Sequence, residues 1–170
     1  MVFYHSGFNS IRSMVPDGFL QRFLRQVMEV YNVVAKTSEV IVRYAETDAQ
    51  GVVHHATYPI WFEEGRSEFL RQIGTPYSEW EKMGYYVVVA ELSLRYLAPA
   101  FYEDQLTVET SLQRLKKRLI EFSYRILRGD ELIVQGSSRH LIVGPDKLPR
   151  ALAGDFYQRL NDLLAEQETA

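Results

Sequence analysis

The sequence contains no cysteine among its 170 residues. A disulfide framework, thiolate ligands for zinc and a cysteine nucleophile are therefore excluded. A chain without cysteine fits a reducing compartment, so we expect a cytoplasmic protein.

Long apolar runs and an excess of basic residues are also missing. No run approaches the roughly 20 apolar residues of a membrane-spanning helix, and the N-terminus lacks a basic start followed by an apolar block. The formal net charge is −3, so the basic surface typical of nucleic-acid binding is absent. We expect neither a membrane span nor a nucleic-acid partner.

Several catalytic motifs are missing as well. The sequence has no G-x-S-x-G nucleophile motif, no P-loop and no dinucleotide-binding glycine pattern. His54 and His55 are adjacent, but no second cluster of ligating side chains stands at metal-site spacing. We therefore expect no metal and no cofactor.

One strong helix is predicted over residues 57–74, "TYPIWFEEGRSEFLRQIG". Its apolar residues recur at helical spacing: Tyr58, Trp61, Phe62, Phe69 and Ile73. Gly65 lies inside this stripe, which predicts close approach of another backbone, and Gly74 ends the helix. Glu63 and Glu64 are expected on the solvated face, with Glu64 and Glu68 paired to Arg66 or Arg71.

Period-2 alternation predicts five strands, and a closing helix follows them. The strands are expected at 38–46, 85–99, 104–115, 118–128 and 132–144, and the helix at 154–167. This order predicts an α+β domain whose last four strands form an antiparallel meander, curved around the long helix. The edges of such a sheet invite pairing with a second copy of the chain.

Residues 1–37 form an N-terminal extension to the main domain at 38–170. Helical spacing within 16–34 predicts an amphipathic helix, with Asp17 as its N-cap. That helix could cover a sheet edge, join an oligomer interface or belong to a leader.

The loop between the first strand and the long helix carries the candidate chemistry, "YAETDAQGVVHHATY" at 44–58. Asp48 can form an Asx-turn that caps the helix ahead, or it can act as a nucleophile or general base. Gly51 permits a bend or close approach of a ligand. Tyr44 and Glu46, two residues apart on the expected strand, share a face, and Tyr44 either orients a carboxylate or packs in the core.

The start of the long helix is expected at or just after His55. The first N–H groups of a helix have no partner within it and can stabilise an oxyanion. The main-chain N–H of His55 is the best candidate for this role. The loop therefore predicts a site made of a carboxylate and a helix N-terminus.

The stretch "RYAETDAQGVVHHATYPIWFEEGR" resembles the signature of the 4-hydroxybenzoyl-CoA thioesterase-like family of hotdog-fold acyl-CoA thioesterases. The matching positions are Tyr44, Thr47, Asp48, Gly51, Val52, Val53, His55, Tyr58, Trp61 and Phe62. Further resemblance in "RYLAPAFYEDQLTVET" and "SRHLIVGPDKLPRAL" extends it over about residues 38–160. Gln50 departs from the glycine or small residue of many relatives.

The resemblance implies a hotdog fold and hydrolysis of an acyl-CoA thioester. It implies that Asp48 is the catalytic carboxylate, that Tyr44 and His55 line the same site, and that the N–H near His55 polarises the carbonyl. Gly51, Val53 and Tyr58 are expected to contact the substrate. It also implies a homodimer or homotetramer with the active site between subunits.

The phosphates of CoA need basic partners, and "RLKKR" at 114–118 is the one dense basic cluster. Lys116 and Lys117 either clamp these phosphates or belong to a solvated hairpin. The nature of the acyl group stays open, since four aromatic residues can border a pocket or form core: Tyr77, Trp80, Tyr85 and Tyr86. A non-catalytic acyl-CoA sensor and a dehydratase on the same fold are the alternatives to a thioesterase.

Overall fold

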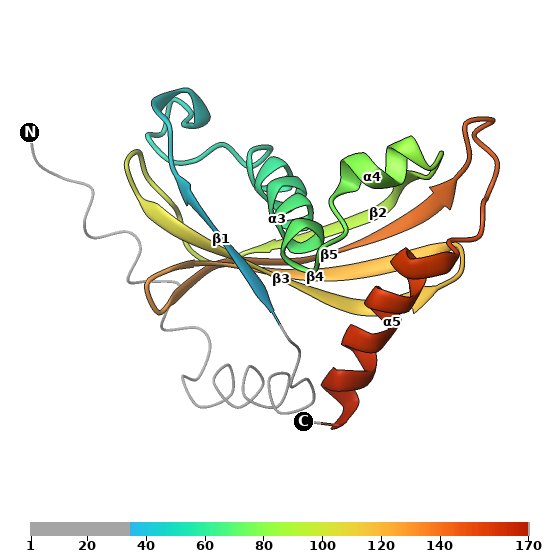
Figure 1. Ribbon diagram of the computed structural model, residues 1–170. Helices are drawn as coiled ribbons and strands as arrows, with labels where there is room; N and C mark the ends of the chain where they lie inside the picture. Colours follow the sequence, from blue (N-terminus) through green and yellow to red (C-terminus); the bar gives the residue numbers. More distant parts are fainter. Residues whose placement is uncertain (1–34, 170) are drawn as a thin grey trace, which may run out of the picture. The chain divides into compact units, whose positions relative to one another are not determined.

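The computed structural model describes residues 35–169, except for the side chains of 167–169 (Figure 1). The helix predicted within 16–34 lies outside these residues. The elements are β1 (Lys36–Ile41), a 3₁₀ helix (Tyr44–Glu46), α3 (Tyr58–Gln72), α4 (Tyr77–Lys82), β2 (Tyr86–Tyr96), β3 (Gln105–Lys116), β4 (Leu119–Arg128), β5 (Glu131–Val143) and α5 (Gly154–Thr169).

All five strands form one antiparallel sheet in the order β1-β3-β4-β5-β2. The predicted α+β architecture is confirmed, but the predicted four-strand meander is wrong, because only β3, β4 and β5 are consecutive neighbours. β3 is paired with β1 on one edge and with β4 on the other, so β2 does not pair with β3, its neighbour in sequence. It pairs with the free edge of β5 instead. Period-2 alternation identifies strands and faces but does not specify which strands are neighbours.

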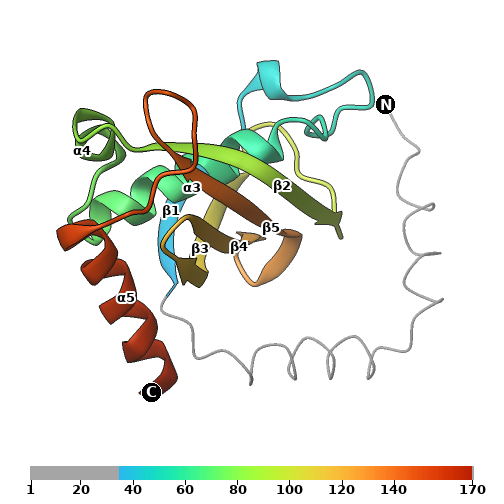
Figure 2. The same ribbon diagram turned by 90° about the vertical axis from the view of Figure 1, so that its right-hand side faces the viewer.

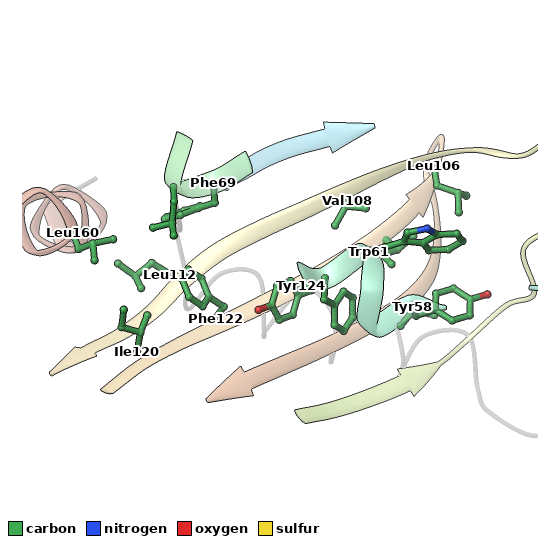
Figure 3. Packing of buried hydrophobic residues seen from close by; sticks show 14 of the residues in the cluster. Tyr58, Trp61, Phe69, Leu106, Val108, Leu112, Ile120, Phe122, Tyr124 and Leu160 are labelled. Atoms are coloured by element: carbon green, nitrogen blue, oxygen red, sulfur yellow. The ribbon is translucent and has the colours of Figure 1, made fainter. Parts of the chain in front are cut away.

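The curved sheet lies against α3, which runs across one of its faces (Figures 1 and 2). The alternation in β4 puts every second side chain on this face, so Ile120, Phe122 and Tyr124 are buried. Phe62 stacks on Tyr124 with ring centroids 4.1 Å apart, and Phe69 meets Phe122 edge-on at 5.5 Å. Figure 3 shows this layer of large side chains between helix and sheet. Their burial is the main stabilising contribution to the domain.

Two glycines allow α3 to lie so close to the sheet. A Cβ atom at Gly65 would collide with the side chains of Thr110 and Val108 on β3. The predicted close approach is therefore of side chains rather than of another backbone. A Cβ atom at Gly136 of β5 would lie 2.6 Å from the ring of Phe62.

Gly74 ends α3 as predicted. Its φ of 74° lies in the left-handed region, which glycine adopts without strain. The N–H of Thr75 donates to the carbonyl of Leu70 at 2.8 Å, and the N–H of Gly74 donates to that of Arg71 at 3.0 Å. This pair of bonds is a Schellman motif, which satisfies two carbonyls at the helix end.

Candidate active site

The segment after β1 is not the continuous strand that the sequence predicts. β1 ends at Ile41, and Tyr44–Glu46 form a 3₁₀ helix, so Tyr44 and Glu46 do not share a strand face. Glu46 is buried and accepts hydrogen bonds from the main-chain N–H and the guanidinium of Arg43, both at 2.7 Å. Burial disfavours its ionisation, but these bonds outweigh burial and hold the pKa of Glu46 below its ordinary value.

Tyr44 is exposed rather than part of the core. Its ring meets Tyr102 edge-on, with centroids 5.6 Å apart, and its carbonyl accepts a 2.8 Å hydrogen bond from the hydroxyl of Thr47. The side chain therefore belongs to the surface formed by the 3₁₀ helix and the connection between β2 and β3. Its role in a site stays a prediction.

Asp48 lies in a short closed loop. An antiparallel bridge between Thr47 and Val53 closes this loop, and the N–H of Asp48 donates to the carbonyl of Val52 at 2.9 Å. Oδ1 of Asp48 accepts the N–H of Gln50 at 2.8 Å, so Asp48 forms the predicted Asx-turn. The predicted capping of the helix is wrong, because this turn lies ten residues before α3, which has no side-chain cap. The half-buried carboxylate keeps Oδ2 without a hydrogen-bond donor among the described residues.

His55 lies in a turn that precedes the long helix. The helix begins at Tyr58, just after His55, because residues 55–57 form a tighter turn in which the N–H of Thr57 donates to the carbonyl of His54 at 2.9 Å. Within the described part of the chain, the N–H of His55 has no acceptor. The carbonyl of His55 accepts the hydroxyl of Tyr96 at 3.0 Å, which ties this turn to the end of β2.

The two adjacent histidines do not diverge. Their rings lie 4.1 Å apart at a tilt of 36°, and Nδ1 of His54 accepts the N–H of Ala56 at 3.2 Å. Residues 35–169 contain no group of three or more His, Cys, Asp or Glu side chains arranged to hold a metal ion.

The first turn of α3 supplies no negative charge of its own. Thr57 makes no side-chain capping bond, and the first turn contains no acidic residue. The partial positive charge of the helix end therefore remains available to an anionic oxygen. The His55 turn leads directly into this helix end.

The remaining motif residues shape the loop. Gly51 has a φ of 76° and open space around its α-carbon, so it serves the turn rather than a close packing contact. Val53 and Tyr58 are buried in the core. The N–H of Val53 donates to the carbonyl of Ala100 at 2.8 Å, and burial raises the pKa of Tyr58. Their contact with substrate stays a prediction.

Lys116 and Lys117 lie at the far end of the sheet from Asp48. β1 ends opposite Gln105, at the start of β3, whereas Lys116 ends β3. The span from Gln105 to Lys116 is roughly 35 Å at the usual rise per residue. Both lysines are exposed, so within one subunit they cannot reach a substrate carbonyl at Asp48.

A buried polar chain links α3 to the sheet, and sequence reasoning missed it. The guanidinium of Arg66 donates to the hydroxyl of Tyr124 at 3.1 Å, Tyr124 shares a 2.5 Å hydrogen bond with Ser138, and Ser138 shares one of 2.6 Å with Nε2 of His140. Period-2 alternation could have indicated it, because Tyr124, Ser138 and His140 stand at positions of β4 and β5 that alternate with more exposed ones and face the core. The predicted surface pairing holds only for Arg71 with Glu68.

Comparison with known proteins agrees with this fold. A family model described as the thioesterase superfamily matches residues 50–135. The acyl-CoA thioester hydrolase YbgC of Escherichia coli O6:H1 is 29% identical over 125 residues, covering 69% of this chain and 92% of the relative. The solved structure of TT1821 from Thermus thermophilus has a TM-score of 0.73 and 36% identity, covering 76% of this chain and 98% of its own.

A second solved structure is similar as well. The DHNA-CoA thioesterase of Staphylococcus aureus has a TM-score of 0.71 and 25% identity, covering 79% of this chain and 91% of its own. The curved antiparallel sheet around one long helix is thus the hotdog fold of thioesterases, as predicted. The chain belongs to the thioesterase superfamily. No helix within residues 35–169 is long and apolar enough to cross a membrane.

Proposed function

We propose that the protein hydrolyses acyl-CoA thioesters, with Asp48 as the catalytic carboxylate. One observation carries the proposal: a half-buried carboxylate, Asp48, lies seven residues before the main-chain N–H of His55, in the segment that leads into a helix without a side-chain cap. Among the described residues, Oδ2 of Asp48 has no donor and the N–H of His55 has no acceptor. The names of the relatives agree with this chemistry.

The thioester carbonyl would lie against the His55 turn and the start of α3. Negative charge that develops on the carbonyl oxygen is stabilised there by the main-chain N–H and the helix dipole. Asp48 then attacks the acyl carbon to give a mixed anhydride, or it removes a proton from an attacking water. Direct attack expels the CoA thiolate and leaves the mixed anhydride, which water then hydrolyses to the free acid and Asp48. In the general-base route, water adds to the acyl carbon, and the adduct expels the thiolate to give the free acid. In a single turnover in ¹⁸O-labelled water, an unlabelled acid with ¹⁸O in the Asp48 carboxylate would establish direct attack, because water has then opened the anhydride at the Asp48 carboxyl carbon.

A homodimer joined along β2 completes this proposal. β2 is an edge strand with exposed apolar side chains, including Val88, Val89, Leu92 and Tyr96. A two-fold axis pairs such a strand with itself antiparallel, so the start of one β2 lies beside the end of the other. This brings the β3–β4 turn of one subunit toward the partner's Asp48 loop. Lys116 and Lys117 would then bind CoA phosphates at the partner's site, and the expected tetramer would contain two such dimers.

Replacing the proposed carboxylate tests the function. We expect Asp48→Asn to lower kcat by about a hundredfold or more while the thermal midpoint stays near that of the parent, because the amide lacks the basic oxygen. The assay is release of free thiol from a panel of acyl-CoAs. Asp130→Asn, on the exposed β4–β5 turn, is the matched control. An Asp48→Asn protein with the parental rate would remove Asp48 from the mechanism, and a parent that releases no thiol would favour the sensor alternative.

A further inference from the structure

A cavity of about 260 Å³ lies between α3, α4 and the start of β2. Its walls are largely apolar and aromatic, and the lining residues are Glu63, Arg66, Ser67, Leu70, Tyr77, Trp80, Val87, Val89, Ile120, Phe122 and His140. An apolar cavity of about 150 Å³ is enough to hold benzene. This cavity therefore has room for one ring or a short acyl chain.

Both end members of the buried polar chain, Arg66 and His140, line this cavity. Tyr124 and Ser138 connect them behind the wall. Burial, and then the positive charge of Arg66, lower the pKa of His140 to about 4, so its ring is neutral at pH 7. These hydrogen-bonded side chains thus hold the guanidinium of Arg66 in place without supplying a negative charge.

The cavity wall has hydrogen-bond donors without acceptors. Among the described residues Arg66 forms no ion pair, and only one of its five N–H groups has a partner, the hydroxyl of Tyr124. The carboxylate among the lining residues, Glu63, is on an exposed position of α3. A half-buried guanidinium with free donors is well suited to a carboxylate or another acceptor oxygen.

We propose that this cavity binds the far end of the acyl group, and that Arg66 selects acyl groups carrying an acceptor oxygen there, a carboxylate above all, over plain alkyl chains. The inference rests on the proposed acyl-CoA thioesterase function and names its substrate class. Arg66 acts as a specificity-determining residue, while Tyr124, Ser138 and His140 position its side chain.

The cavity lies at a suitable distance from a catalytic loop. Arg66 is eight residues beyond Tyr58, about 12 Å along the helix from the N-terminus of α3. In the proposed dimer, Val87 and Val89 of one subunit lie beside the end of the partner's β2, where Tyr96 holds the carbonyl of His55. An acyl group bound at the partner's Asp48 would therefore cross the line where the two β2 strands pair, the β2 seam, and enter this cavity.

Binding of nonhydrolysable ligands tests this inference separately from catalysis. The probes are CoA thioethers of equal chain length that end in a carboxylate, a hydroxyl or a methyl group, measured by calorimetry. We expect the parent to bind the carboxylate thioether at least tenfold tighter than the alkyl one. Arg66→Gln should lose at least tenfold for the carboxylate ligand and change less than about twofold for the alkyl ligand.

Two further variants keep the test independent of folding defects. Arg71→Gln, on an exposed position of the same helix, should leave all three affinities unchanged. Arg66→Lys should restore part of the preference, because it retains the charge but not the fork of donors. A preference for the hydroxyl ligand lost in Arg66→Gln would support a neutral acceptor oxygen. Equal affinity of the parent for all three ligands, or an equal loss for all three in Arg66→Gln, would overturn the inference. Failure of thiol release with intact binding preference would overturn only the thioesterase.

Discussion

His140 is a buried neutral histidine whose protonation costs stability. Its side chain is 1% exposed, and its pKa is about 4 in the fold against about 6.5 in an unfolded chain. Above pH 6.5 both states are neutral and the group has no effect. As pH falls toward 4, the unfolded chain binds the proton first, so the folded state loses stability in that window.

We expect this titration to remove about 2 kcal/mol from the free energy of unfolding between pH 7.5 and pH 5. In His140→Gln the amide can still bond Ser138, but the titration is absent. Urea denaturation of both proteins at the two pH values measures the difference. The depressed pKa of Glu46 also weakens the fold in acid, but equally in both proteins. Parallel pH profiles for parent and variant would contradict a neutral buried His140.

Individual residues differ in how far the sequence predicted them. The spacing in the 44–58 loop predicted the Asx-turn at Asp48, because that geometry depends on residues two to five positions away. The environment of Arg66 could not be predicted in the same way. Its partner Tyr124 is 58 positions distant, and helical periodicity alone favoured a pair with a neighbouring glutamate.

At the scale of elements, the contact between α3 and β3 depends on Gly65. Alanine there would improve helix propensity by at most about 1 kcal/mol. Its Cβ would collide with Thr110 and Val108, and such overpacking costs about 1–3 kcal/mol. We therefore expect Gly65→Ala to lower the free energy of unfolding by about 1–2 kcal/mol, measured by urea denaturation.

A second variant identifies the cause. The hydroxyl of Thr110 is buried and has no hydrogen-bond partner among the described residues, so its removal costs little. Gly65→Ala should be less destabilising in a Thr110→Ala background, because the colliding oxygen is gone. Glu64→Ala, exposed on the same helix, is the control for helix propensity. An equal cost in both backgrounds would mean that another contact limits the approach of α3.

The elements themselves follow from local pattern, and their assembly does not. Helical spacing predicted α3 and its glycine stop, and period-2 alternation predicted the five strands and the buried face of β4. β2 shows no such alternation of burial. β1 ends at Ile41 and a 3₁₀ helix follows at Tyr44–Glu46, so the alternation predicts a strand that extends five residues too far. The neighbours of β2 depend on which sheet edge is free, and that is a property of the whole fold.

For the whole molecule, the proposed dimer relates two sites by symmetry. In this dimer, antiparallel pairing of β2 would join the Asp48 loop of one subunit to the Arg66 cavity of the other, so each site would need residues from both chains. A heterodimer of one Asp48→Asn subunit and one Arg66→Gln subunit would then contain one intact site and one doubly altered site. The arrangement within a single subunit would leave no intact site.

This heterodimer can be isolated with two different affinity tags and assayed with a carboxyacyl-CoA. We expect about half of the parental rate, since one of two symmetric sites is complete. Homodimers of each variant, purified the same way, set the background. A heterodimer no more active than the Arg66→Gln homodimer would assign Asp48 and Arg66 to the same subunit. A monomeric mass measured by light scattering would rule out the dimer proposed along β2. The hydrolysis rate of the heterodimer, compared with the rates of the two variant homodimers, thus decides whether Asp48 and Arg66 of one site belong to the same subunit.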